Sequence, residues 1–437
     1  MSGNGDVEAK LSKLLSQARR HVSTSRGKVV YRDSSGEALV ESIKDLMVET
    51  FINTGELSQA MEWISILEHV LAESSKLVGG SGWSLSKEFK SFMADPRAHM
   101  RKKLFNYTFD LLRGKMGLSD YVEKSRQALT TSFKTNIRTL YQSWVLASTV
   151  YLLGLEGAKI VYPEHGQIML ERSGKQKAGI IPPNIVLRLI DGGEVSFYFE
   201  APRPLGWEDT SDLKRVWKLY VSLRPDIMIY SGRVLNIVNL SNPEIPIMRP
   251  DIIVECKELK DWHLRARTIR GPRAKPLTAE EWMSRWIAGL WEGLGEALGV
   301  SREQLGELLT GAKGGVRVTE VDLLNMYRRT FNPNKFIVVS RFKVDANTKN
   351  KLEAEDIRVV DEADIGDLKA IEQVAGEVKL IAKPEREDPI SGLMLHLKTL
   401  GINVGPEELE KALAELAYRR IEELIQIISG DGAGGGI

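Results

Sequence analysis

The chain has 437 residues, of which 43% are hydrophobic and 27% charged, and its formal net charge is +1. This length predicts two or three domains, and the composition excludes collagen-like, mucin-like and wholly disordered proteins. A single cysteine excludes an internal disulfide framework, and no Cys/His pattern has zinc-site spacing, which favours a reduced, cytoplasmic protein. Because the net charge is near zero, any basic surface for nucleic acid must be local.

Neither secretion nor membrane insertion is expected. Residues Met1 to Lys13 are polar and lack the apolar core of a signal peptide. The longest uncharged apolar stretch, Trp144 to Leu155, is shorter than the roughly 20 residues that a membrane span requires. We therefore interpret this stretch as part of a core helix and expect no membrane partner.

Residues 1–134 are predicted to form an all-helical N-terminal region without an assigned role. Apolar residues recur there at spacings of three and four, which is typical of amphipathic helices. The clearest groups are Leu11, Leu14 and Leu15, then Ile43, Met47 and Phe51, then Trp63, Ile66 and Leu67.

Residues 135–382 are predicted to form an α/β domain with a mixed sheet flanked by helices. A periodic helix ends at Leu155, and the turn Asp191-Gly192-Gly193 joins two strands as a hairpin. Predicted strands are Gln167–Leu170, Ile185–Ile190, Glu194–Phe199, Val234–Leu240, Phe336–Arg341 and Ile357–Asp361, and predicted helices are Thr278–Leu298 and Asn347–Glu355.

Residues 383–437 are predicted to lie outside this domain. The segment Lys383 to Pro389 is charged and bracketed by prolines, which is typical of a linker. Two short helices between Leu393 and Ile428 and a flexible glycine-rich tail, Gly430 to Gly436, complete the chain.

Two apolar runs contain the same tripeptide, Arg-Pro-Asp, which ends at Asp226 in the first and at Asp251 in the second. The second run continues to Glu255-Cys256-Lys257. In a strand, Glu255 and Lys257 share one face while Cys256 points to the other. Burying these charges is costly unless a partner or a metal replaces their hydration.

Together with the strand-helix-strand pattern from Phe336 to Asp361, these motifs resemble the PD-(D/E)xK nuclease superfamily. The resemblance implies a restriction-endonuclease-like core and a Mg²⁺-dependent endonuclease that hydrolyses DNA phosphodiester bonds, with Mn²⁺ able to substitute. It implies that Asp226, Glu255 and the Cys256 carbonyl bind the metal, and that Lys257 orients or polarises the attacking water. Two carboxylates suffice for Mg²⁺ when water and phosphate complete its shell.

Three other acidic residues are candidates for the site. Asp251 is an alternative to Asp226, although it lies about 13 Å from Glu255 along an ideal strand, too far for both to bind one ion. The resemblance also allows an additional acid, for which Glu156 and Glu200 are candidates beside their interpretation as ordinary surface charges.

A basic segment follows the Glu-x-Lys triplet and is expected to hold the phosphate backbone of DNA, with a solvated charged surface as the alternative. Its residues are Lys260, Arg265, Arg267, Arg270, Arg273 and Lys275. Arg341, at the end of a predicted strand, is a further candidate for a phosphate contact, and Trp262 is a candidate for DNA contact.

Two other functions remain open from the sequence. One is a catalytically inactive nucleic-acid-binding or assembly protein on a nuclease-like scaffold, with its helical flanks bound to a protein partner. The other is a helical interaction scaffold. Restriction or defence and DNA repair or recombination all use the expected chemistry, and cutting both strands of a duplex favours a homodimer.

Overall fold

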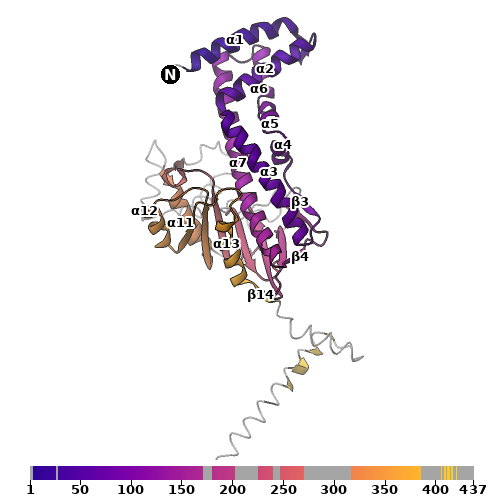
Figure 1. Ribbon diagram of the computed structural model, residues 1–437, viewed down its shortest axis with the longest axis vertical. Helices are drawn as coiled ribbons and strands as arrows, with labels where there is room; N and C mark the ends of the chain where they lie inside the picture. The colour runs from indigo at the N-terminus through magenta and orange to yellow at the C-terminus, as the bar shows by residue number, and fades with distance from the viewer. Residues whose placement is uncertain are drawn as a thin grey trace, which may run out of the picture. The chain divides into compact units, whose positions relative to one another are not determined.

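The structure, a computed structural model, describes residues 3–25, 28–170, 180–201, 225–239, 247–269 and 316–384, and a few positions between 405 and 420 (Figure 1). Two compact units are present: one comprises Met1–Ile190 and Glu194–Ala382, the other Asp191–Gly193 and Lys383–Ile437. The division after Ala382 lies at the predicted boundary. The boundary predicted at residue 134 instead falls inside a helix, α7 (Leu118–Leu155), of the first unit.

Helices dominate the N-terminal part of the first unit. They are α1 (Gly3–His21), α2 (Ser34–Phe51), α3 (Thr54–Leu77), α4 (Lys87–Ala94), α5 (Pro96–Lys103) and α6 (Phe105–Leu112). The expectation of an all-helical region is wrong at two places. Strands β1 (Val22–Ser25) and β2 (Lys28–Tyr31) pair antiparallel, and β3 (Gly82–Ser84) pairs with β5 (Gln167–Met169). Valine and threonine in the first two strands favour extended backbone.

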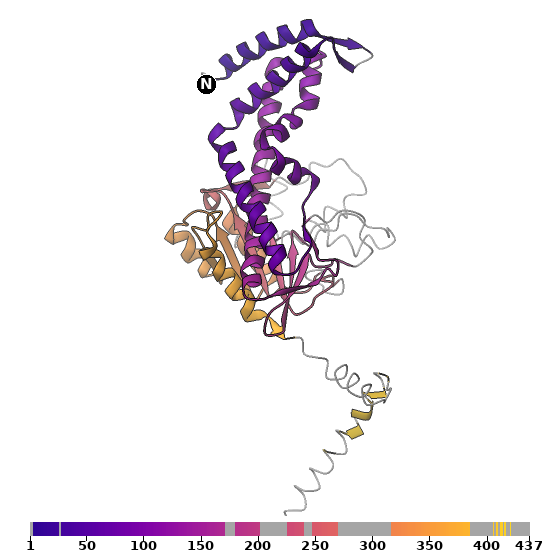
Figure 2. The ribbon, with the colours of Figure 1, turned by 45° about the vertical axis from the view of Figure 1, so that its right-hand side comes forward.

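Helix α7 packs along α3 for much of its length, as both Figure 1 and Figure 2 show. Its buried side chains include Leu129, Phe133, Leu140 and Trp144, which continue the three- and four-residue spacing of one helix face. The same helix also contacts β9 (Ile252–Lys257) of the sheet. One helix therefore belongs to both the N-terminal bundle and the α/β core.

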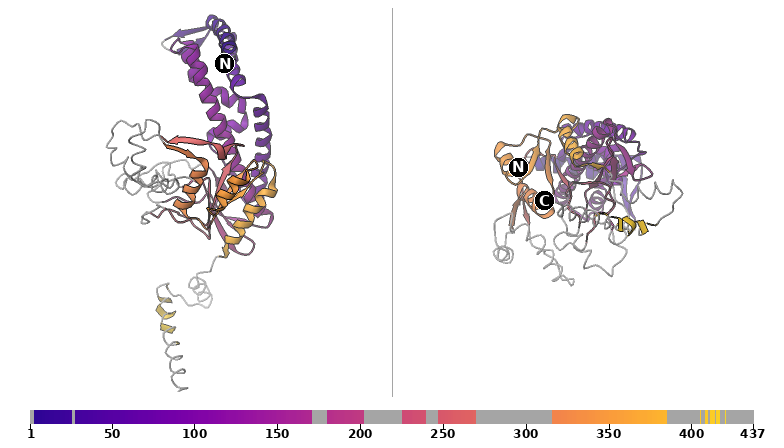
Figure 3. Two further views of the ribbon diagram at one scale, coloured as in Figure 1. Left: turned by 90° about the vertical axis from the view of Figure 1, so that its left-hand side faces the viewer. Right: turned by 90° about the horizontal axis from the view of Figure 1, so that it is seen from below.

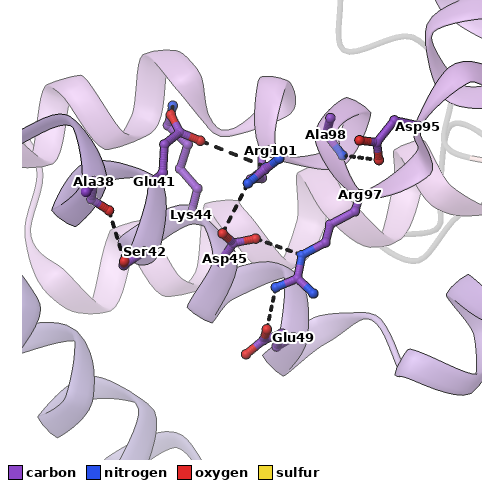
Figure 4. Close-up of polar contacts among 10 residues, drawn as sticks. All are labelled: Ala38, Glu41, Ser42, Lys44, Asp45, Glu49, Asp95, Arg97, Ala98 and Arg101. Atoms are coloured by element: carbon purple, nitrogen blue, oxygen red, sulfur yellow. Dashed lines mark hydrogen bonds and ion pairs between the residues drawn. The ribbon is translucent and has the colours of Figure 1, made fainter. Parts of the chain in front are cut away.

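Ion pairs join α2 to α5 (Figure 4). Arg97 donates from Nε to Asp45 over 2.9 Å and also pairs with Glu49. Arg101, one turn later, pairs with Asp45 over 3.2 Å and lies 3.9 Å from Glu41. Residues four apart lie on one face of a helix, so both arginines reach the same acidic stripe.

The central sheet has the strand order β13-β12-β9-β8-β7-β6-β4. The remaining bounds are β4 (Lys159–Tyr162), β6 (Ile185–Arg188), β7 (Gly193–Phe199), β8 (Ile227–Ser231), β12 (Lys335–Ser340) and β13 (Ile357–Val360). β9, β12 and β13 are parallel, whereas β8, β7, β6 and β4 continue the sheet antiparallel (Figure 3). The predicted mixed α/β sheet is confirmed.

The two faces of the sheet bury different cores. Ile252, Val254 and Cys256 of β9 belong to the core shared with α7 and α13 (Leu368–Ile381), which lie side by side on the sheet (Figure 1). Ile253, between them, belongs to the opposite core, shared with α11 (Glu320–Phe331) and α12 (Ala346–Glu353). Alternation along β9 therefore directs Glu255 and Lys257 to one face, opposite Cys256 as predicted, and this face is the α11 side.

Four short elements remain in the described ranges. They are η1 (Trp262–Leu264), the antiparallel pair β10 (Ala266–Ile269) and β11 (Val316–Thr319), and β14 (Lys383–Pro384) of the second unit. No helix in the described ranges is both long enough and apolar enough to cross a bilayer.

Most predicted strands of the sheet are present, but the run from Val234 is not one. Its described part, up to residue 239, forms a single bridge between Val238 and Ile247. The Asn236 side chain accepts hydrogen bonds from the backbone N–H groups of Ile181 and Val238, which replaces a regular strand ladder. The predicted helix from Thr278 and the C-terminal predictions beyond residue 384 lie outside the described ranges, apart from the few positions between 405 and 420.

Candidate functional site

A cavity of about 720 Å³ opens where β8 begins and β9 ends. These ends meet at one edge because the two strands are antiparallel. Side chains from this edge line the cavity together with residues of α7 and α11. Asp226, Glu255 and Lys257 all line it, so the structure brings the predicted triad together.

Hydrogen bonds from backbone N–H groups hold the Asp226 and Glu255 carboxylates next to each other. The Asp226 N–H donates to Glu255 Oε1 over 2.9 Å, and the Cys256 N–H donates to Asp226 Oδ2 over 2.7 Å. The other Asp226 oxygen, Oδ1, accepts a 2.6 Å bond from Nε2 of Gln142 on α7. These bonds fix the direction of both carboxylates without using all their lone pairs.

Lys257 lies between two carboxylates. Its Nζ is 3.4 Å from Glu255 Oε2 and 3.3 Å from Glu320 Oε2, and its side chain is only 14% exposed. Glu320 is the first residue of α11 and is itself buried. The Trp262 ring centroid lies 5.9 Å from the ammonium, within range of a cation–π contact.

The pKa values of Asp226, Glu255 and Lys257 are shifted because these groups are buried close to one another. Loss of hydration, with the neighbouring Glu255 charge, raises the pKa of Asp226 well above its usual range. Loss of hydration also raises the pKa of Glu255, although Lys257 opposes this shift. Burial alone would lower the pKa of Lys257, but the surrounding carboxylates outweigh it and raise that pKa. Lys257 is therefore charged near neutral pH.

The charges of the group suit a divalent cation. Asp226, Glu255 and Glu320 carry three negative charges when ionised, and Lys257 offsets only one of them. A doubly charged ion would neutralise the remainder and relieve the raised carboxyl pKa values. Hard oxygen ligands are those Mg²⁺ prefers, and it retains several waters in such sites.

An orphaned polar atom lies beside this group. Oε1 of Gln142 is buried and has no hydrogen-bond partner among the described residues. A water bound beside the carboxylates could satisfy it. Within the described ranges no three His, Cys, Asp or Glu side chains together form a metal site, so an ion here would depend on Asp226 and Glu255. The Cys256 carbonyl stays a predicted ligand.

Among the other acidic candidates, only Glu200 lines the cavity. It is exposed, and its N–H donates to the Asp226 carbonyl over 2.8 Å. Asp251 lies at the other end of β9, where its side chain accepts bonds from the Ser231 N–H and from Asn334. Glu156 pairs with Lys379 outside the cavity. Asp251 therefore binds donors at the far end of the strand and does not line the cavity.

The predicted basic segment is only partly described. Arg265 lines the cavity and pairs with Asp261 over 2.9 Å. Lys260 is exposed beside a neighbouring pocket, and the backbone of Arg267 lies in β10. The side chain of Arg267, and the whole of Arg270, Arg273 and Lys275, lie outside the described structure.

The two remaining candidates for DNA contact are held by neighbouring side chains. Trp262 lines the cavity, but it is only 2% exposed and donates to Ser340 Oγ over 3.0 Å, so its ring has little surface for a DNA contact. Arg341 does not line the cavity; its guanidinium lies 3.9 Å from the Trp63 ring centroid and pairs with Asp364. Both side chains fill spaces between elements that are distant in the sequence.

Sequence reasoning missed several residues of the cavity, among them Arg138 and Gln142 on α7, and Glu320 on α11. Gln142 lies in a helix whose sequence pattern is mainly apolar. The available signal was a polar amide beside Tyr141 and Trp144, at a position that the pattern expects to be buried. Glu320 follows the triplet by more than 60 residues, so no local spacing connects them. A Thr319-x-x-Asp322 capping box does mark the start of its helix.

Comparisons with known proteins give no match: no family model, no curated protein and no solved structure is significantly similar to this chain.

Proposed function

We propose that the chain is a Mg²⁺-dependent nuclease that hydrolyses DNA phosphodiester bonds at the cavity, with a core of the PD-(D/E)xK type. The observation that carries this proposal is one ammonium between two carboxylates, with Asp226 bonded beside Glu255, in an open cavity at the sheet edge. The strand arrangement supports it, because the acid before β8 and the Glu-x-Lys triplet of β9 share one edge and one face.

Asp226 and Glu255 would hold the ion, and Gln142 would keep the Asp226 carboxylate in position. A bound Mg²⁺ supplies positive charge against the phosphate and makes an attached water more acidic. The raised pKa of Lys257 keeps it protonated, so it acts as a hydrogen-bond donor and a fixed charge rather than as a base. It is placed to orient the attacking water and to stabilise charge on the phosphate.

Glu320 would position Lys257. Without a second carboxylate 3.3 Å away, the ammonium could rotate fully onto Glu255 and compete with the ion for its oxygen. With Glu320 present, the lysine is shared between two acids, and both distances exceed the 2.7–2.9 Å of a strong charge-assisted bond. The ammonium is therefore available to a substrate.

Purified protein incubated with supercoiled, linear, single-stranded and branched DNA, with Mg²⁺, Mn²⁺ or EDTA, tests the proposal. We expect metal-dependent cleavage that Glu255→Gln abolishes. Glu156→Gln is the matched control, since it removes an acid outside the cavity. Failure to cleave any of these substrates with either metal would overturn the proposal and favour the inactive nucleic-acid-binding alternative.

A further inference from the structure

One helix, α11, contributes both a carboxylate and apolar side chains to the wall of the cavity. Glu320, Leu323, Leu324 and Tyr327 of α11 all line the cavity. Their spacing of three, four and seven residues places them on one face of the helix. The first residue of that face contacts Lys257, and the following turns continue as apolar and aromatic surface. The same cavity is thus charged on one side and apolar on the other.

The apolar wall is accessible and held in place. Leu323 and Tyr327 are partly exposed, whereas Leu324 beneath them is 1% exposed. The Tyr327 ring has an edge contact with the buried Phe331, with ring centroids 6.2 Å apart at 85°. A ring whose position is already fixed by packing loses little conformational entropy when it contacts a ligand.

Two cations line the cavity from different elements. Arg138 of α7 has a side chain that is 47% exposed and lies 3.7 Å from Glu258, and Arg265 after η1 is 39% exposed. The Arg265–Asp261 pair is exposed and contributes little stability, so this guanidinium can exchange its carboxylate for a phosphate. Glu258 is only 6% exposed, so Arg138 keeps this partner and contacts a phosphate with its remaining N–H groups. Charged groups, an aromatic wall and two guanidinium groups are together complementary to the parts of one nucleotide.

A base in an intact duplex cannot reach such a wall. Its faces are stacked against neighbouring bases, and only its edges are accessible in the grooves. An unpaired base can leave the stack and pack against aromatic and apolar side chains. The cavity volume of about 720 Å³ is within the range of sites that enclose small ligands, and far too small for a duplex.

We propose that the cavity accepts an unpaired nucleotide, with its base against Leu323 and Tyr327 and its phosphate toward Lys257. The substrate class is single-stranded nucleic acid, including the single-stranded part of a branched or frayed duplex. This inference rests on the proposed function only for the cleavage step, because recognition of the unpaired base by α11 requires no hydrolysis.

Binding and cleavage are measured with a labelled single strand and with a blunt duplex of the same sequence. Anisotropy in EDTA reports binding, and single-turnover assays in Mg²⁺ report cleavage. We expect the single strand to bind at least tenfold more tightly than the duplex. Tyr327→Ala reduces this preference by about tenfold to a hundredfold, the range for loss of one stacked base, and Tyr327→Phe restores most of it.

Leu323→Asn provides a second variant at a partly exposed position, and Leu380→Asn, on α13 and 78% exposed, is its matched control. Equal binding of single strand and duplex, or equal preference in the Ala and Phe variants, would overturn the inference. A single-strand preference that depends on Tyr327 without any cleavage would support the inference and refute the nuclease proposal. Cleavage of duplex and single strand at equal rates would support the nuclease proposal and refute the inference.

Discussion

Replacing Lys257 with methionine tests the electrostatic account of the cavity. The substitution keeps an unbranched side chain of similar length but removes the charge that separates Glu255 from Glu320. Breaking a buried ion pair by removing one partner costs about 3–5 kcal/mol. Because both contacts are longer than 3.2 Å, we expect a value near the lower limit, about 3 kcal/mol, at a pH where the carboxylates are ionised.

The corresponding fall in melting temperature is about 6 °C, at about 2 °C per kcal/mol for a large unit. Mg²⁺ should restore part of this loss in Lys257→Met, because a bound ion replaces the missing positive charge. Cleavage should nevertheless remain lost, since the ion cannot replace the donor that orients the water. In this one variant, Mg²⁺ would thus restore thermal stability without restoring cleavage.

Thermal unfolding at pH 8, in EDTA and in Mg²⁺, is compared with DNA cleavage under the same conditions. Lys369→Met is the control, because Lys369 is exposed on α13, and its stability should change by less than about 0.5 kcal/mol. Wild-type stability and wild-type cleavage in Lys257→Met would refute both the burial argument and the assigned role.

Three further predictions concern other contacts. Because burial raises the pKa of Asp226, the folded state binds its proton more tightly than the unfolded state does, and metal-free stability should fall as pH rises from the ordinary carboxyl range to the raised pKa. Unfolding followed against pH should show a smaller slope in Asp226→Asn, with the remainder due to Glu255, and an unchanged slope would contradict the shift. Arg138→Gln should weaken single-strand binding and reduce the slope of log affinity against log salt by about 0.7, and an unchanged slope would exclude a phosphate contact. Arg97→Ala removes the ion pairs from α5 to Asp45 and Glu49. Because these side chains are partly exposed, the free energy of unfolding in a denaturant titration should fall by only about 1 kcal/mol. A loss several times larger would contradict the classification of these contacts as ordinary exposed ion pairs.

The strands of the sheet could largely be predicted because each is a short apolar run with a local boundary. Phe336 to Arg341 and Ile357 to Asp361 lie within one residue of β12 and β13. Helices α11 and α13 were missed, although each begins with a local signal: Thr319 and Asp322 form a capping box at α11, and the Asp367 side chain caps α13. The predicted boundary at residue 134 lies inside α7, because local apolar spacing does not reveal that one helix continues a single core from the N-terminal helices to the sheet.

The site could be predicted where its residues are close in sequence or carried by adjacent strands. Glu255 and Lys257 share a face through simple alternation, and Asp226 lies beside them through strand pairing. Gln142 and Glu320 come from helices on either side, and their approach depends on packing that no spacing encodes. The environment of Trp262 likewise depends on Ser340, 78 residues away.

The continuity of α7 has a practical consequence for dissecting the chain. Its 38 residues correspond to about 57 Å of uninterrupted helix, with Leu129 and Phe133 packed among the N-terminal helices and Gln142 bonded to Asp226. A fragment that begins at residue 135 would lack the N-terminal turns of α7. The remaining part of the helix would also lose its apolar contacts with the N-terminal helices. A fragment that contains the sheet should therefore begin upstream of Leu118. The first 117 residues support the helix that positions Asp226, so removing them should disturb the carboxylate pair.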